Sequence, residues 1–515
     1  MKRTCTHILT WSMLMTLTAP AQSNAITSTT SASVIAETSD VESLSRTIND
    51  ICALPHYASA TVTVAFTDAA TGKPFFERDA LRSAVPASCM KAITTAAALH
   101  YLGASHRFTT TLEKRGTIDA SGNLRGDLII RGGGDPALGS NRIEGSATSA
   151  TLLADWAKAV EKAGIKSIHG DIIVDDSFFT REPIPDAWDW VDIGNYYATG
   201  TSGLSFNDNL FHLYFEPGKS AGAPAKILRT DPELPGIEWI NEMLTGPADS
   251  GDQGWIYGAT GSPKRWTKGT IPMGPEFSIK GALPDPGLVL ARELIKAGIT
   301  ICAQGNVRYY DSEHASLSKD NNEGTTRVIA MTQSPPLSQI VRTLNKQSFN
   351  FYAEMLLMHI ARAAGNGTRD SGIAAEMRFL KQLGVDLRGV HISDGSGLSR
   401  NDCVTARAMT DLFRLAQKEP WFQAWHDSMP ILGVDADLSE REKHSPIKGK
   451  VHAKTGLITR VRGLCGLLET ASGRKVSFAL FANNYDTGWT QVDKDFDTIL
   501  RSAYDHLGKQ RLPGR

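Results

Sequence analysis

SCMKAITTAAALHYLG, residues 88–103, is the stretch that decides the fold. Its apolar residues recur near helical spacing and a glycine ends the run, so a buried helix is predicted to begin at about Ser88. Residues i and i+3 share a helix face, which lets the Lys91 amine approach the Ser88 hydroxyl. A lysine kept neutral by burial or by a neighbouring cation can take the hydroxyl proton, and the N–H groups at the helix start would face the developing oxyanion. The stretch therefore predicts serine acyl transfer.

The pattern Ser-x-x-Lys is weak by itself, because it also begins at Ser316, Ser445 and Ser472. Ser316 lies in a polar stretch, a proline follows Ser445, and Ser472 lies beside a glycine in an expected turn. Only the copy at Ser88 has the features of a buried helix start. The competing interpretation of Ser88 is an ordinary helix cap.

Two further motifs follow in fixed order, Ser348-Phe349-Asn350 and Lys454-Thr455-Gly456. The first lies between two helical patterns, and the second lies on an expected strand just before a hairpin at residues 463–482. Ser-Phe-Asn also occurs at Ser205, so position in the predicted fold, more than the letters, selects Ser348. Together the three motifs specify a serine acyl-transfer site.

Length and composition describe a globular chain of several domains. The chain has 515 residues, 41% of them hydrophobic, which allows about three domains. Its net charge is −1, and it would be −3 without Lys2 and Arg3, so nothing favours a polyanionic partner such as nucleic acid.

Residues 1–25 have the pattern of a signal peptide. Lys2 and Arg3 precede an apolar segment at residues 8–17, and small residues follow, with cleavage expected after Ala21 or Ala25. No later run is long enough to span a bilayer. We expect an exported, periplasmic protein without a transmembrane segment in its mature form; an uncleaved leader acting as an anchor is the alternative.

The cysteines and the glycine-rich segment carry no recognisable site. Removal of the leader leaves five of six cysteines, an odd number without zinc-finger spacing, and His-Glu-x-x-His does not occur, so we expect no metal and no cofactor. Cys89 follows the proposed nucleophile but should point about 100° away from it on a helix, which makes it a packing residue. The glycines at residues 132–134 lack the Gly-Lys-Ser/Thr ending of a phosphate loop and are interpreted as a turn.

The spacing of the motifs predicts a discontinuous catalytic domain. Ser88 and Ser348 are 260 residues apart, more than one site needs for a connection, so whole domains must be inserted between them. Residues 26–45 are rich in Ser, Thr and Ala and are interpreted as a flexible segment. We assign residues 46–112 and 282–515 to the catalytic domain and 113–281 to the insertion, which is either one domain or two nested ones, the inner at about 205–270.

The three motifs together resemble those of the penicillin-binding proteins and serine β-lactamases. The segments VPASCMKAITTAAALHYLG, LNKQSFNFYAEMLL, SDGSGLSRND and AKTGLITRVRGLCG are similar to the peptidase S13 family, the PBP4-like class C low-molecular-mass penicillin-binding proteins. RGDLIIRGGGDPAL, residues 188–197 and FSIKGALPDP match in the same order. The resemblance implies a multi-domain α/β protein whose β-lactamase/transpeptidase-like catalytic domain, an antiparallel sheet with helices, is interrupted by mainly β inserted domains.

The resemblance also implies a function, a serine-type D-alanyl-D-alanine carboxypeptidase acting on peptidoglycan stem peptides, often with endopeptidase activity on cross-links. β-Lactams would acylate the same serine. Ser88 would attack after Lys91 takes its proton, Ser348 would relay the proton to the leaving amine, and Asn350 would orient the substrate amide. The terminal carboxylate would meet Lys454 and its neighbours. The implied substrate-binding residues on this strand are Thr455, Gly456, Leu457 and Thr459.

Two positions of the motifs depart from the pattern of the family. Leu457 stands where relatives often carry Ser or Thr, which removes a side-chain donor but keeps the backbone N–H for the oxyanion hole with that of Ser88. Phe349 stands where Asp is common. Substrate recognition is carried over to three residues: Asp192 would meet the free amino end of a diaminopimelate side chain, helped by Tyr197 and Arg400. The opposite charges of Asp192 and Arg400 would suit a zwitterionic substrate end. For Arg400 a structural salt bridge is the competing interpretation.

Two rival functions remain from the sequence, a serine β-lactamase and a non-catalytic penicillin-binding sensor. The lactamase needs a second base for fast deacylation, and no Glu can be assigned to it. The intact Ser88 and Lys91 argue against the sensor. An α/β-hydrolase is disfavoured because Gly-x-Ser-x-Gly does not occur.

Overall fold

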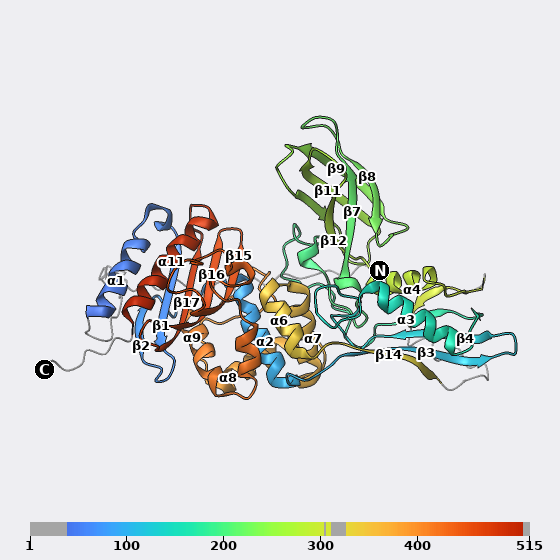
Figure 1. The fold of residues 1–515 in the computed structure, drawn as a ribbon, viewed down its shortest axis with the longest axis horizontal. Coiled ribbons are helices and arrows are strands. Elements are labelled where there is room, and N and C mark those ends of the chain that lie inside the picture. The colour runs from blue at the N-terminus through green and yellow to red at the C-terminus, as the bar shows by residue number, and fades with distance from the viewer. Residues whose placement is uncertain (1–38, 303–304, 311–325, 508–515) are drawn as a thin grey trace, which may run out of the picture.

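The computed structural model describes residues 39–302, 305–310 and 326–507. The predicted leader (1–25), most of the predicted flexible segment and Ser316 lie outside these residues. The described part is elongated, with a five-stranded sheet at one end, a six-stranded sheet at the other and a smaller β part projecting from the middle (Figure 1). Among the described residues, no helix combines the length and the apolar character that crossing a bilayer needs.

The five-stranded sheet contains the first two and the last three strands of the described chain, and all of its pairings are antiparallel. One face of the sheet packs against the first and last helices, and the other against the helices around the Ser88 stretch (Figure 1). Burial on both faces explains why β16 and β17 are almost continuously apolar. In sheet order the strands are β15 (Val451–Ile458), β16 (Val461–Glu469), β17 (Lys475–Asn483), β1 (Thr61–Asp68) and β2 (Pro74–Arg78).

The Ser88 stretch forms the centre of a helical group. Its helix is buried along ten consecutive residues from Met90 to Leu99, so it is buried on every side, although it carries the polar side chains of Lys91, Thr94 and Thr95. A 3₁₀ turn carries Ser88 itself, and the α-helix begins two residues later. The helices of the catalytic part are α1 (Ser39–Cys52), α2 (Met90–Leu102), α6 (Leu337–Gln347), α7 (Asn350–Ala364), α8 (Arg369–Leu383), α9 (Ala406–Leu415), α10 (Phe422–Ser428) and α11 (Trp489–His506).

The six-stranded sheet lies within the insertion and has the order β13-β6-β4-β3-β14, with β5 beside β4. Two helices pack on it around a core that includes Trp156. Its strands are β3 (Thr109–Ile118), β4 (Asn123–Arg131), β5 (Ser167–Ile168), β6 (Ile172–Asp175), β13 (Val307–Tyr309) and β14 (Arg327–Gln333), and its helices are α3 (Ser149–Lys162) and α4 (Pro286–Lys296).

The projecting part consists of two three-stranded sheets with the orders β12-β7-β8 and β10-β11-β9. Its strands are β7 (Leu210–Glu216), β8 (Lys226–Asp231), β9 (Glu238–Gly246), β10 (Gln253–Tyr257), β11 (Lys264–Pro272) and β12 (Phe277–Ala282). The 3₁₀ turns of the described chain are η1 (Pro55–Tyr57), η2 (Ala87–Cys89), η3 (Tyr196–Ala198), η4 (Asn207–Asn209), η5 (Ala416–Lys418) and η6 (Ala436–Leu438).

Two sequence boundaries differ from the structure. Residues 282–333, assigned to the catalytic domain, contribute α4, β13 and β14, and both strands pair within the inserted sheet. The helical pattern that marks the return to the catalytic part begins only at α6. The flexible segment predicted to end at residue 45 is helical from Ser39, because Val41, Leu44 and Ile48 form one apolar face buried in the core.

Candidate active site

The three sequence motifs meet in one cleft of ≈530 Å³. Ser88 comes from the η2 turn, Ser348 and Asn350 from the junction between α6 and α7, and Thr455 from β15. The cleft lies at the edge strand of the five-stranded sheet. Residues 430–432 pair with the start of β15, and the part of the strand at residues 455–458 lines the cleft, where it can meet a ligand. The structure therefore brings together residues that are hundreds of positions apart.

Lys91 lies beside the hydroxyl that it was predicted to activate. Its Nζ is 2.8 Å from Ser88 Oγ, and the side chain is fully buried. Burial, assisted by the positive charge of Lys454, lowers the pKa of Lys91 to about 7, against the opposing effect of Asp394 and Glu354. At neutral pH a substantial fraction of this amine is unprotonated and can accept the Ser88 proton.

Two oxygen atoms besides Ser88 Oγ fix the Lys91 amine. It donates to Asn350 Oδ1 at 2.6 Å and to the Ser396 carbonyl oxygen at 2.6 Å. Asn350 in turn donates through Nδ2 to the Tyr197 carbonyl oxygen at 2.8 Å. Asn350 thus connects the base to the inserted segment that forms the opposite wall of the cleft.

Ser348 and Lys454 form a second pair in the cleft. Lys454 Nζ donates to Ser348 Oγ at 2.9 Å and to the Thr455 carbonyl oxygen at 3.0 Å. Burial lowers the pKa of Lys454. Ser348 ends α6 in the left-handed conformation, with φ 54° and ψ 39°, and this turns the chain so that Asn350 begins α7. A second serine and a second lysine therefore join the Ser88–Lys91 pair from two other elements, the α6–α7 junction and β15.

Strand β15 passes very close to the η2 turn that carries Ser88. A Cβ on Gly456 would lie 2.2 Å from the Pro86 carbonyl oxygen, so only glycine fits there. Thr455 Oγ1 donates to Asp437 Oδ2 at 2.5 Å, and Leu457 is 42% exposed at the cleft. Cys89 is buried against this strand, with its Sγ 3.3 Å from the Lys454 carbonyl oxygen, as expected of a packing residue.

A buried ion pair, missed by the sequence reasoning, lies at the floor of the cleft. Arg462 on β16 donates to both carboxylate oxygens of Asp493 on α11, at 2.7 and 2.9 Å, and also to the Gly456 carbonyl oxygen at 3.3 Å. Asp437 and Trp489 line the same cleft. The segment AKTGLITRVRG contains Arg462, but none of the segments singled out in the sequence contains Asp437, Trp489 or Asp493.

The predicted substrate-recognition residues share the cleft, and Arg400 also makes a salt bridge, as its competing interpretation expects. Tyr197 donates through its hydroxyl to Asp192 Oδ1 at 3.0 Å, and burial raises the pKa of Asp192. Arg400 contacts Asp189 Oδ2 at 3.3 Å and the Thr459 carbonyl oxygen at 3.3 Å. The ion-pair partner of Arg400 is thus Asp189, and the Asp192 carboxylate keeps one oxygen for a ligand.

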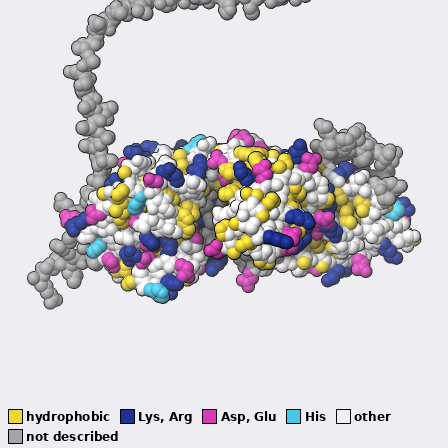
Figure 2. Space-filling view, turned by 90° about the horizontal axis from the view of Figure 1, so that it is seen from above, with side chains coloured by type: hydrophobic (Ala, Val, Ile, Leu, Met, Phe, Trp, Pro, Cys, Tyr) yellow, Lys and Arg dark blue, Asp and Glu magenta, His cyan; other side chains and the backbone are white. Residues whose placement is uncertain are grey.

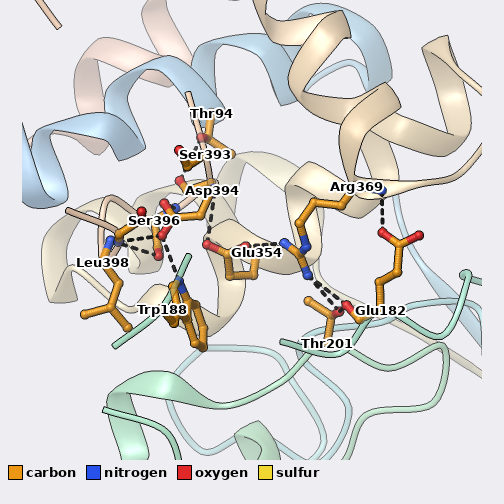
Figure 3. A network of polar contacts seen from close by, with 12 residues as sticks. Thr94, Glu182, Trp188, Thr201, Glu354, Arg369, Ser393, Asp394, Ser396 and Leu398 are labelled. Carbon is orange, nitrogen blue, oxygen red and sulfur yellow. Dashed lines mark hydrogen bonds and ion pairs between the residues drawn. The ribbon is translucent and has the colours of Figure 1, made fainter. Parts of the chain in front are cut away.

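A buried polar network joins Arg369, Glu354 and the loop that contains Asp394 and Ser396 (Figure 3). Glu354 on α7 accepts from Arg369 at 2.6 Å and from the Gly395 N–H at 3.0 Å. Asp394 accepts from the N–H groups of Ser396 and Gly397 at 3.0 and 2.6 Å. These bonds hold the loop whose Ser396 carbonyl receives the Lys91 amine.

The comparisons with known proteins agree with this geometry. The family described as D-Ala-D-Ala carboxypeptidase 3 (S13) matches residues 44–502. The chain belongs to this family. The family and the enzyme class predicted from the motifs, a D-Ala-D-Ala carboxypeptidase, are therefore confirmed.

Two relatives and one solved structure are similar to this chain over most of its length. A D-alanyl-D-alanine carboxypeptidase of an Actinomadura species is 30% identical over 453 residues, 84% of this chain and 79% of that protein. D-alanyl-D-alanine carboxypeptidase DacB of Haemophilus influenzae is 27% identical over 415 residues, 78% of this chain and 81% of that protein. The crystal structure of penicillin binding protein 4 from H. influenzae matches with TM-score 0.72 and 24% identity over 91% of this chain and 99% of that chain, which confirms the fold class.

Proposed function

We propose that this protein removes the terminal D-Ala of peptidoglycan stem peptides through an acyl-enzyme on Ser88, and that it also opens D-alanyl cross-links. The observation that carries the proposal is the 2.8 Å contact between Lys91 Nζ and Ser88 Oγ in a fully buried setting. An acyl-transfer serine needs a base of this kind at hydrogen-bond distance, with a pKa near the working pH.

In the first half of the reaction Lys91 takes the proton of Ser88, and Ser88 Oγ forms a bond to the carbonyl carbon of the penultimate D-Ala. The backbone N–H groups of Ser88 and Leu457 are assigned to the resulting oxyanion. Collapse of the intermediate breaks the C–N bond, and Ser348 relays the proton that Lys91 took from Ser88 to the amine of the leaving D-Ala, which leaves Lys91 neutral again. Water then attacks the ester carbonyl and gives a proton to Lys91. The ester C–O bond breaks, Ser88 Oγ takes this proton back from Lys91, and the shortened peptide is released.

The other cleft residues place the substrate. Lys454 and the Thr455 hydroxyl are assigned to the terminal carboxylate, which suits the buried positive charge of Lys454 in the middle of β15. The Thr455 hydroxyl donates to Asp437 in the free protein and would turn to the substrate on binding. Asn350 is assigned to the substrate amide, and Gly456 allows the peptide to lie against the strand. A β-lactam presents a carboxylate and a reactive amide in the same relation, so the same steps would leave it bound to Ser88.

The recognition residues at the rim suit a stem peptide with a free amine. Asp192 and Arg400 line the same cleft, and a side chain that ends in both an amine and a carboxylate could meet both charges. An amine in this position is also the group that a cross-link acylates, which is why we include cross-link opening. Export to the periplasm is part of the proposal and is supported by the leader pattern at residues 1–25.

The test is digestion of purified peptidoglycan with the wild-type protein and Ser88→Ala, followed by mass analysis of the fragments. The proposal expects release of free D-Ala and of uncross-linked muropeptides by the wild type only. Fragments that keep their terminal D-Ala but are less cross-linked would exclude the carboxypeptidase activity and leave only the endopeptidase activity. A penicillin adduct that hydrolyses within milliseconds, rather than over hours, would instead indicate a β-lactamase.

A further inference from the structure

The sheet β10-β11-β9 of the projecting part has a solvent-exposed aromatic face. Side chains alternate along a strand, so register partners lie side by side on one face. Trp266 on β11 lies between Tyr257 on β10 and Ile240 on β9, and Trp255 lies beside Lys268. On the opposite face Ile256 and Thr267 are fully buried, so the sheet packs its other side on the core.

The aromatic face exposes large apolar side chains to solvent, which is energetically unfavourable unless a partner covers them. Trp255 and Trp266 are 38% and 36% exposed, and Ile240 and Leu244 on the neighbouring strand are 53% and 40% exposed. Figure 2 views the molecule from the side toward which this part projects, and hydrophobic side chains gather on its central lobe, separated by a hollow from the catalytic part. Contiguous exposed apolar groups of this kind mark binding surfaces.

Aromatic rings connect this face with the active-site cleft. The ring of Tyr257 lies 5.5 Å from that of Trp266 and 6.5 Å from that of Trp190, the latter stacked with an interplanar angle of 25°. Trp190 is 59% exposed, and both of its chain neighbours, Asp189 and Val191, line the cleft. The rings therefore form a path that begins at the cleft rim and ends on the sheet.

The charged side chains on the aromatic face limit the chemical classes of partner that it can bind. Lys264 and Lys268 on β11 lie beside Glu238 and Glu242 on β9, so the face carries equal numbers of both charges. A nucleic acid or an anionic membrane would require an excess of positive charge, and the centre of a protein interface is depleted of Lys and Glu. A sugar ring has an apolar C–H face that stacks on an aromatic ring and hydroxyl and amide groups at its edge that bond to such charged groups.

We propose that the aromatic face of Trp255, Tyr257 and Trp266 binds the polysaccharide strand that carries the stem peptides. The inference rests on the proposed function, because a stem peptide in the cleft is covalently attached to such a strand. The ring path then places N-acetylated hexosamine units along the projecting part while the peptide reaches Ser88. The face would favour substrates in the intact wall over soluble peptides.

The first test measures glycan binding by the full-length protein without any catalytic step. Chitotetraose, a peptide-free chain of N-acetylglucosamine, is titrated against the wild type, a Trp255→Ala/Trp266→Ala double variant and Trp266→Phe. We expect the double variant to lose about tenfold in affinity and Trp266→Phe to bind nearly as the wild type, because the phenyl ring keeps a stacking surface. Met331→Ala, which changes a 61% exposed residue in another sheet, is the matched control and should bind normally.

The second test separates this inference from the proposed function. D-Ala release from a soluble pentapeptide and penicillin labelling should be unchanged in the double variant, which also shows that it folds, while D-Ala release from insoluble peptidoglycan should fall about tenfold. Unchanged glycan binding in the double variant, or none in the wild type, would overturn the inference and assign the face to a protein partner or a second copy, even if the soluble peptide is cleaved. Glycan binding without cleavage of any peptide would overturn the proposed function alone.

Discussion

The indole Nε1 of Trp188 donates a 2.8 Å hydrogen bond to Asp394 Oδ2, and this bond joins the insertion to the loop that contacts Lys91 (Figure 3). Asp394 also accepts from the Ser396 N–H, and the Ser396 carbonyl oxygen receives the Lys91 amine. The insertion is therefore structurally connected to the base, besides forming one wall of the cleft. Both side chains of the bond are buried, so water cannot replace a lost donor without cost.

Trp188→Phe tests the contribution of this bond. Phenylalanine keeps most of the packing but removes the donor to Asp394, so the free energy of unfolding should fall by about 1–3 kcal/mol. Trp190→Phe is the matched control, because Trp190 is 59% exposed and its replacement should change stability little. Chemical denaturation of both variants provides the measurement. Equal losses in the free energy of unfolding of the two variants would show that the buried Trp188–Asp394 hydrogen bond does not stabilise the fold.

The pH dependence of kcat/KM reports on Lys91. The base must be neutral to accept the Ser88 proton, and burial lowers its pKa to about 7. Activity should therefore be low below pH 7, where the amine is protonated, and should rise to a plateau above it. A profile that is flat from pH 5 to pH 9 would mean that another group is the base.

Lys454 should influence that profile through its charge. Its positive charge is the second cause of the lowered Lys91 pKa, so Lys454→Gln should raise the Lys91 pKa and move the midpoint to higher pH. Lys454→Gln should also raise KM, because it removes the contact assigned to the terminal carboxylate of the substrate. This increase in KM does not depend on the titration of Lys91. An unchanged midpoint in rates extrapolated to saturating substrate would contradict the electrostatic link between the two lysines.

Asp192→Asn tests the recognition of a free amine. The substitution keeps the shape and the Tyr197 contact but removes the charge, so kcat/KM for a peptide with a free diaminopimelate amine should fall about tenfold. The same peptide with that amine acetylated is the control and should be cleaved equally by both proteins. A similar loss on both peptides would remove Asp192 from its assigned role.

The buried pair between Arg369 and Glu354 should matter for folding. Both side chains are buried, and removing the guanidinium leaves an uncompensated carboxylate, so Arg369→Met should cost about 3–5 kcal/mol in the free energy of unfolding. Arg229→Met removes one partner of the exposed pair with Glu276 and should change stability little. Comparable effects in denaturation curves would show that burial of the first pair is unimportant.

Local patterns were sufficient to predict the catalytic core of this fold. The Ser88 helix, the helical junction at Ser348 and the strand at Lys454 each have a periodicity or a turn signal of their own, and the structure has all three. Positions that depend on pairing between distant segments could not be predicted. The pairing of β14 with β3 moved the domain boundary, because neither strand has a sequence signal that names its partner.

The candidate site shows the same division. Ser88, Lys91, Ser348, Asn350 and Lys454 belong to motifs and could be predicted, whereas Arg462 and Asp493 lie on two elements that meet only in the folded state. The salt bridge between Arg400 and Asp189 depends on the path of an inserted loop. Such contacts are properties of tertiary structure and leave no local pattern.

The central claim is that Ser88 is the acylated nucleophile. Its most direct test is mass spectrometry of the full-length protein after brief exposure to benzylpenicillin, with peptide mapping of the adduct. The wild type should gain the mass of one penicillin on the peptide that contains Ser88, and Ser88→Ala should gain none. An adduct on another residue, or labelling that persists in Ser88→Ala, would contradict the account.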